Sequence, residues 1–205
     1  MDKQTPYSSL TEITTNESFN GLYAQLEGTE HPYILRPMLG YTPHIGAMLS
    51  MMDLNRQWLI ESVEKLSVAQ LDFQFDDQSN SIGAMLLHLA ATERGFQITS
   101  FKLYENNEEN LNKEWAEKWE VVRKLGKQAR QVQGNSIEFY LDTLADIRKV
   151  TLDGFAQKDD QWFMAPMHSP DGRTNNYYWQ WFHLCQHESY HRAQINLVKQ
   201  RLPTE

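Results

Sequence analysis

The sequence has few of the residues that cross-link a chain, break it or anchor it in a membrane. Among 205 residues there is one cysteine, Cys185, so no internal disulfide can form and the cytoplasm is the expected location. With only 7 Pro and 10 Gly, the composition is that of a globular chain. No run approaches the roughly twenty apolar residues that cross a bilayer, and the first residues lack the apolar segment of a signal peptide. We therefore expect no membrane partner and no secretion.

Positive charge is also scarce. The chain has 19 Lys and Arg against 27 Asp and Glu, which gives a net charge of −8 and a pI near 5.4. No basic patch with interleaved aromatic residues is present. Because an acidic surface is repelled by phosphate groups, we expect no nucleic-acid partner and no binding to anionic membranes.

Long helices are the main pattern that the sequence does contain. Apolar residues recur at alternating spacings of four and three, the stripe of a helix packed in a bundle. This pattern predicts four helices, over about residues 43–66, 81–104, 136–157 and 175–202. Since no strand signal accompanies them, we expect an all-α four-helix bundle over residues 42–205.

The first 41 residues have little periodicity, and we interpret them as an irregular N-terminal extension with a short helical turn around Phe19–Leu26. Two further segments interrupt the bundle. A short amphipathic helix is expected at about 112–124, where Trp115 and Trp119 either pack on the bundle or line a pocket. A loop of about sixteen residues, 158–173, contains His168, which either faces a substrate or lies in a solvated turn.

Charged and polar side chains fall within the buried stripes of three predicted helices, among them Arg148 on the third. Arg56 interrupts the first stripe, and we expect its stem to lie on the core with its head at the rim. Glu188 and His191 lie on the stripe of the fourth helix. Burying either without a partner costs several kcal/mol, so both need partners in the core.

The nine residues His183–His191 gather three histidines, a carboxylate and the only cysteine. His187 and His191 are four residues apart, so a helix directs both imidazoles to the same side, as half of a divalent-metal site. The same HExxH pattern marks zincin peptidases, in which the glutamate is the general base. The fourteen residues after His191 lack the spacing of a zincin third ligand, so the missing ligand must come from upstream.

The other histidines are weaker candidates by themselves. His88 lies in an apolar turn of the second predicted helix, where a lone histidine is more often a core residue. Because the site at His187 and His191 lacks a third ligand, His88 becomes a candidate for it. We expect His31 and His44 to be surface or capping residues. His183 is a candidate extra ligand, and Cys185 is expected to be a small buried apolar side chain.

Taken together, the motifs resemble the DinB-like superfamily of damage-inducible four-helix bundles. The resemblance covers about residues 42–203 and rests on three motifs: Ser81–His88 with Glu93, the turn around Arg148, and His187–Ile195. It implies a divalent metal, Zn or Ni, held by His88, His187 and His191. The sequence departs from the family pattern at Ala193, where a glycine commonly follows the arginine.

The resemblance also implies a function. Characterised members include thiol-dependent S-transferases and isomerases, others are described as metal-dependent hydrolases, and many form homodimers. We therefore expect a homodimeric, metal-dependent transferase or hydrolase acting on a small molecule, with a low-molecular-weight thiol as the candidate cosubstrate. Glu188 is the candidate catalytic residue, either as a base or as a partner that orients a ligand. The alternatives are a zincin-type peptidase and a non-catalytic binding or stress-response bundle whose metal is structural or absent.

Overall fold

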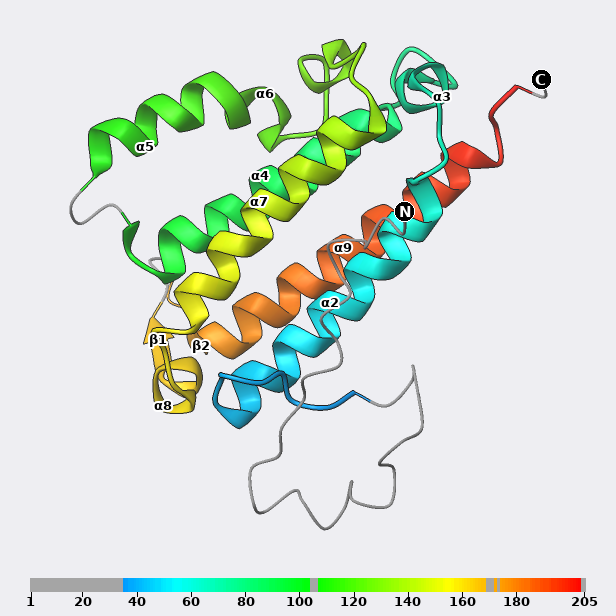
Figure 1. Cartoon of the computed structure of the whole chain (residues 1–205). Helices are drawn as coiled ribbons and strands as arrows, with labels where there is room; N and C mark the ends of the chain where they lie inside the picture. The colour runs from blue at the N-terminus through cyan, green and yellow to red at the C-terminus, as the bar shows by residue number, and fades with distance from the viewer. Residues whose placement is uncertain (1–34, 104–106, 169–171, 173, 204–205) are drawn as a thin grey trace, which may run out of the picture.

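The computed structural model describes residues 35–103, 107–168, 172 and 174–203. Its body is a bundle of four long helices, α2 (Pro43–Val63), α4 (Ile82–Ser100), α7 (Ile137–Phe155) and α9 (Tyr177–Lys199) (Figure 1). Helix α9 packs on both α2 and α4, and α4 packs on α7. The all-α bundle predicted from the sequence is confirmed, and each observed helix is a few residues shorter than expected. None of the described helices is long and apolar enough to span a membrane.

Side-chain caps set the starts of three of these helices. Ser81, Ser136 and Asn176 each accept a hydrogen bond from the backbone N–H three residues later, as N-cap residues do. Helix α2 is capped differently, because Thr42 makes no such bond. Instead, the carboxylate of Asp160 accepts bonds from the backbone N–H groups of His44 and Ile45. The start of α2 is therefore held by a residue 115 positions away from Ile45.

Short elements fill the connections. They are α3 (Val68–Asp72), α5 (Glu108–Glu114), the π-helix η3 (Trp115–Trp119), α6 (Glu120–Arg123), the 3-10 helix η4 (Ala129–Gln131) and α8 (Asp160–Met164). The helix expected at 112–124 is present and begins earlier. Trp119 is buried and Trp115 packs on the same core cluster, so packing is the role that the structure supports for both.

The connection between α7 and α9 differs from the prediction. The expected loop 158–173 contains α8 and strand β1 (Pro166–His168), which pairs antiparallel with β2 (Thr174–Asn176). Expecting no strand was wrong here, because three-residue strands are too short to show an alternating pattern. His168 lies in β1, and its side chain is outside the described structure, as are His31 and the turn expected at Phe19–Leu26.

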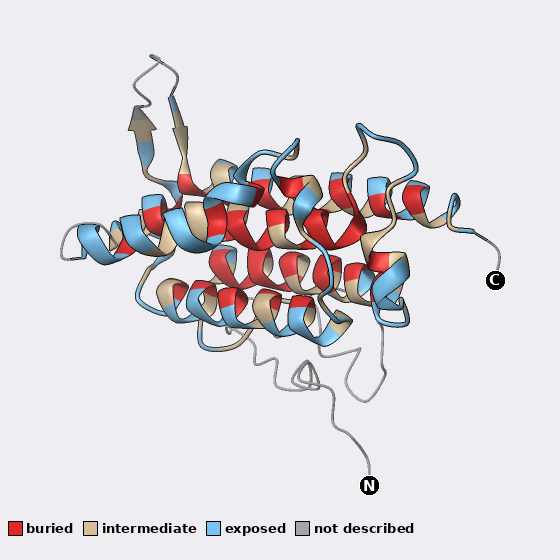
Figure 2. Ribbon diagram, turned by 90° about the horizontal axis from the view of Figure 1, so that it is seen from above, coloured by how far each residue is buried: buried red, intermediate tan, exposed pale blue. Residues whose placement is uncertain are grey.

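The buried faces of the long helices meet inside the bundle (Figure 2). One core cluster is mainly aliphatic, and the other is rich in aromatic rings around Trp181 and Phe155. On α9 the buried residues are those of the predicted stripe within the helix, namely Tyr177, Trp181, Leu184, Glu188, His191, Ile195 and Val198.

Four charged side chains lie at the centre of the bundle, one from each long helix: Arg56, Glu93, Arg148 and Glu188. Arg56 binds Glu188 through Nε at 2.8 Å and Glu93 through Nη2 at 2.9 Å. Arg148 binds Glu93 at 2.7 Å. We call these four residues the charge network. Placing the head of Arg56 at the rim was wrong, because its side chain is only 1% exposed and two carboxylates neutralise it inside the core.

The network keeps Glu93 ionised. Burial by itself would raise the pKa of this carboxyl, but the guanidinium groups of Arg148 and Arg56 and a hydrogen bond from Thr151 lower it to about 2. The carboxylate is therefore a permanent counter-charge for two buried arginines at neutral pH.

Replacing Arg56 by Met removes the residue that joins Glu93 to Glu188 in the charge network. Breaking a buried pair from one side leaves a charge without compensation, so we expect the free energy of unfolding to fall by about 3–5 kcal/mol. Urea denaturation followed by circular dichroism measures the change. Arg123→Met, which removes an exposed pair with Glu120, is the matched control and should leave the unfolding midpoint in place. An Arg56→Met protein as stable as the control would show that the network does not hold the helices together.

The depressed pKa of Glu93 predicts a pH dependence of stability. A carboxyl whose pKa is lower in the folded than in the unfolded chain stabilises the fold above its ordinary pKa of 4.5. This contribution is lost progressively as the pH falls from 4.5 towards 2. The urea concentration at the unfolding midpoint should therefore decrease as the pH is lowered from 6 to 2. The decrease should be less steep in Glu93→Gln than in the unmodified protein. Equal slopes in both proteins would contradict the assignment.

Candidate metal centre

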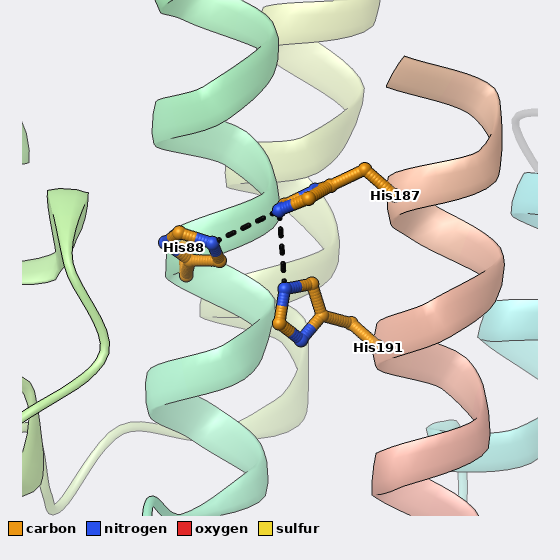
Figure 3. A group of neighbouring side chains, drawn as sticks. All are labelled: His88, His187 and His191. Carbon is orange, nitrogen blue, oxygen red and sulfur yellow. Dashed lines mark hydrogen bonds between the residues drawn. The ribbon is translucent and has the colours of Figure 1, made fainter. Parts of the chain in front are cut away.

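His88 on α4 and His187 and His191 on α9 point their imidazole rings at one another between the two helices (Figure 3). Nε2 of His187 lies 3.2 Å from Nε2 of His88 and 3.1 Å from Nε2 of His191. One nitrogen from each ring falls within a 4.8 Å cluster. The structure thus brings together the three histidines that the sequence analysis assigned, although His88 is 99 residues from His187.

The ring of His88 is oriented by a carbonyl group. Its Nδ1 lies 2.7 Å from the backbone oxygen of Val122 on α6. A carbonyl oxygen only accepts, so Nδ1 carries the proton and donates it. Nε2 of a neutral His88 is then an unprotonated nitrogen whose lone pair points at the other two rings.

His191 is oriented in the same way. Its Nδ1 lies 2.7 Å from Oε1 of Gln194, one turn further along α9, and donates to it. This again leaves Nε2 with a lone pair directed at His187. Partners of this kind, which fix the tautomer of a histidine, are characteristic of metal-ligating histidines.

His187 completes the cluster from the solvent side, being half-buried where the other two rings are buried. Its Nδ1 is enclosed and has no hydrogen-bond partner among the described residues. If Nε2 held the proton, it could satisfy only one of the two lone pairs that face it. A cation bound to all three Nε2 atoms would satisfy every one of them.

All three rings are kept neutral, which is the form that binds a metal. Burial lowers the pKa of His88 and of His191 below the usual value. Burial, together with the proximity of His191, His88 and His183, lowers the pKa of His187 to about 3. At neutral pH the site therefore presents nitrogen lone pairs and has no positive charge of its own to repel a cation.

The residues fit a divalent ion in their spacing as well. Two nitrogens bound tetrahedrally to zinc at about 2.0–2.1 Å are separated by roughly 3.3 Å, close to the two observed separations. Imidazole nitrogen suits Zn, Ni, Cu and Fe alike, so the donor set itself does not choose between them.

Glu188 lies next to the centre in sequence but faces away from it. Its two oxygens accept from Nε and Nη2 of Arg56 at 2.8 and 3.0 Å, and Nη2 of Arg148 is 3.5 Å away. Of the two roles left open for Glu188, this placement favours the orienting one, because both oxygens are already paired with guanidinium groups.

Two other candidates lie outside the cluster. His183 is exposed and its ring stacks on Trp179, with 5.5 Å between the centroids and 5° between the planes. Cys185 is half-buried, and burial followed by the charge of Glu188 raises the pKa of its thiol, which makes it a poor nucleophile.

The sequence analysis missed the groups that orient the ligands. Gln194 could have been found, because it lies one turn after His191 on the same helix. The backbone carbonyl of Val122 could not have been predicted from the sequence, since every residue type has one. The charge network had a signal: Arg56, Arg148 and Glu188 each lie on a predicted buried stripe, and Glu93 was noted among the motifs.

A four-helix bundle with three convergent histidines on two of its helices defines a class of helical proteins able to hold a metal ion. The family model described as the DinB superfamily matches residues 51–195, well over half of the chain, and the protein belongs to that superfamily. This confirms the resemblance drawn from the motifs. No curated protein matches the chain.

The three-histidine cluster predicts that metal content depends on His88. In His88→Ala, the bound zinc or nickel measured by mass spectrometry after dialysis should fall from one equivalent to a small fraction of it. His44→Ala is the matched control, because His44 is exposed and pairs with Asp160 away from the cluster. Unchanged metal content in His88→Ala would rule out the three-histidine site.

Proposed function

We propose that the protein is a metal-dependent enzyme acting on small molecules, with transfer to a low-molecular-weight thiol as the first candidate reaction and hydrolysis as the second. The observation that carries the proposal is the convergence of three neutral imidazoles from α4 and α9, two of them oriented by hydrogen bonds. Catalytic metal sites use three protein ligands and keep one position open, whereas structural zinc sites are usually closed by four.

Each residue has a definite part in this proposal. His88, His187 and His191 hold the ion, and Val122 and Gln194 orient two of the rings. The ion, when bound, supplies Lewis acidity that lowers the pKa of a water or thiol. His187 is half-buried and the other two histidines are buried, so His187 is the ligand nearest to solvent.

Glu188 is proposed as a positioning residue. Its pairing with Arg56 fixes the rotation of α9, and with it the direction of the neighbouring His187. A zincin-type peptidase requires this glutamate at the metal-bound water, and its pairing with guanidinium groups supports the transferase or hydrolase instead. The homodimer and the cytoplasmic location stay predictions.

The test of the proposed function is an activity assay with metal-loaded protein. Zinc-loaded and nickel-loaded samples are mixed with a thiol panel of cysteine, glutathione and 2-mercaptoethanol and an electrophile such as 1-chloro-2,4-dinitrobenzene, and with ester and amide substrates. We expect turnover that is lost on chelation. In His191→Ala turnover should be at least about 100-fold lower, because the ion loses one of its three protein ligands.

The same assay separates the alternatives. Peptide hydrolysis that disappears in Glu188→Gln would point to a peptidase. Absence of turnover from every metal-loaded sample, with metal still bound by His88, His187 and His191, would favour the non-catalytic bundle. His44→Ala serves as the control for both outcomes and should behave as the unmodified protein.

A further inference from the structure

A line of side chains runs along α9 from the metal centre towards the start of the helix. His191, His187, His183 and Trp179 follow one another at intervals of four residues, which places neighbours side by side on the helix surface. The rings of His191 and His187 lie 4.4 Å apart between centroids, and those of His183 and Trp179 are stacked. His183 is also close enough to His187 to contribute to its lowered pKa. We call these four residues the α9 ridge.

The α9 ridge ends at a hollow between α8, the β1–β2 hairpin and the first turn of α9 (their places are labelled in Figure 1). Its volume is about 610 Å³, within the usual range for small-molecule pockets. The residues that line it are Met164, Pro166, Thr174, Asn175, Asn176 and Trp179. Trp179 therefore borders both the hollow and the stacked ring of His183.

The lining of the hollow has a distinct chemistry. None of its six residues carries a charge, three are apolar and three are small and polar. Two of the apolar ones are left open to solvent, since Trp179 is 49% exposed and Met164 is 36% exposed. Exposed large apolar side chains at a concave surface are typical of a place where a ligand binds. Such a surface suits an uncharged group with a flat or apolar body, which stacks on the indole ring.

We propose that this hollow binds the uncharged, aromatic or apolar end of the substrate whose reacting group lies at the three-histidine centre. The inference rests on the proposed function and adds the class of substrate. Trp179 precedes His187 by eight residues, or about 12 Å at the helical rise of 1.5 Å per residue. The substrate must therefore be long enough to span about 12 Å along the α9 ridge.

The test anchors a ligand at the metal and varies the length of its tail. Protein loaded with Co²⁺ is titrated with 2-mercaptoethanol and with ω-phenylalkanethiols of two to six methylene groups, and binding is followed through the cobalt–thiolate absorption. The affinity should rise by at least about tenfold for the longest phenylalkanethiols, because only their rings reach the hollow and bury apolar surface there.

Variants at Trp179 identify the surface that the tail contacts. Trp179→Ala should remove the gain for the longest thiols and leave 2-mercaptoethanol binding unchanged, whereas Trp179→Phe should keep most of the gain. Phe139→Ala is the matched control, because Phe139 is 45% exposed on α7 and is neither a ridge nor a lining residue. Circular dichroism of each variant verifies that it folds.

A second measurement needs no metal. 6-Phenylhexan-1-ol, which lacks a thiol, is added to metal-free protein, and shifts of the indole N–H of Trp179 and the side-chain amides of Asn175 and Asn176 are followed by NMR. We expect saturable shifts at these groups, which disappear in Trp179→Ala for the two asparagines.

The two measurements distinguish the failure of the inference from the failure of the proposed function. If thiols bind cobalt but neither tail length nor Trp179→Ala matters, or if the alcohol leaves the hollow unshifted, the inference is overturned and the metal-dependent reaction is untouched. If the alcohol binds in the hollow but no thiol changes the cobalt absorption, two claims are contradicted. One is the proposed reaction with a thiol, and the other is the proposal that one substrate occupies both the hollow and the three-histidine centre. Gains that depend on tail length and on Trp179, with shifts at the hollow, support the inference.

Discussion

The charge network at the centre of the bundle is the interaction on which the rest of the structure depends. Each of the four long helices contributes one member, so the network fixes how all four are rotated about their axes. Ion pairs buried to this extent stabilise a fold only when every charge is matched, because desolvation opposes them. Two arginines and two glutamates, further bonded to Thr151 and the carbonyl of Leu144, meet that condition.

The geometry of the three-histidine cluster follows from this rotation. Glu188 is bound to Arg56 on one side of α9, and the histidines beside it in sequence are thereby turned towards α4. Val122 and Gln194 then set the tautomers of His88 and His191. A site built in this way is organised before any ligand arrives, so little binding energy is spent on ordering it.

The segment between α7 and α9 has two roles: it holds the starts of two bundle helices, and it lines the proposed substrate site. Asp160 of α8 holds the start of α2, and Asn176 at the end of β2 caps α9. The same segment supplies Met164, Pro166 and Thr174 to the hollow. Because its ends are tied to two of the bundle helices, the hollow keeps a defined position relative to the α9 ridge, which a free loop would not provide.

The sequence by itself determined the four helices, the buried stripe of α9 and the pairing of His187 with His191, because these follow from helical periodicity within one segment. His88 was assigned through a family resemblance, and its ring position was decided by packing between helices. Only the tertiary structure placed Arg56 in the core, brought Val122 to His88 and formed the hairpin. The contacts of Arg56 and of Val122 join residues tens of positions apart. Their energies depend on burial and mutual orientation, which no local pattern encodes.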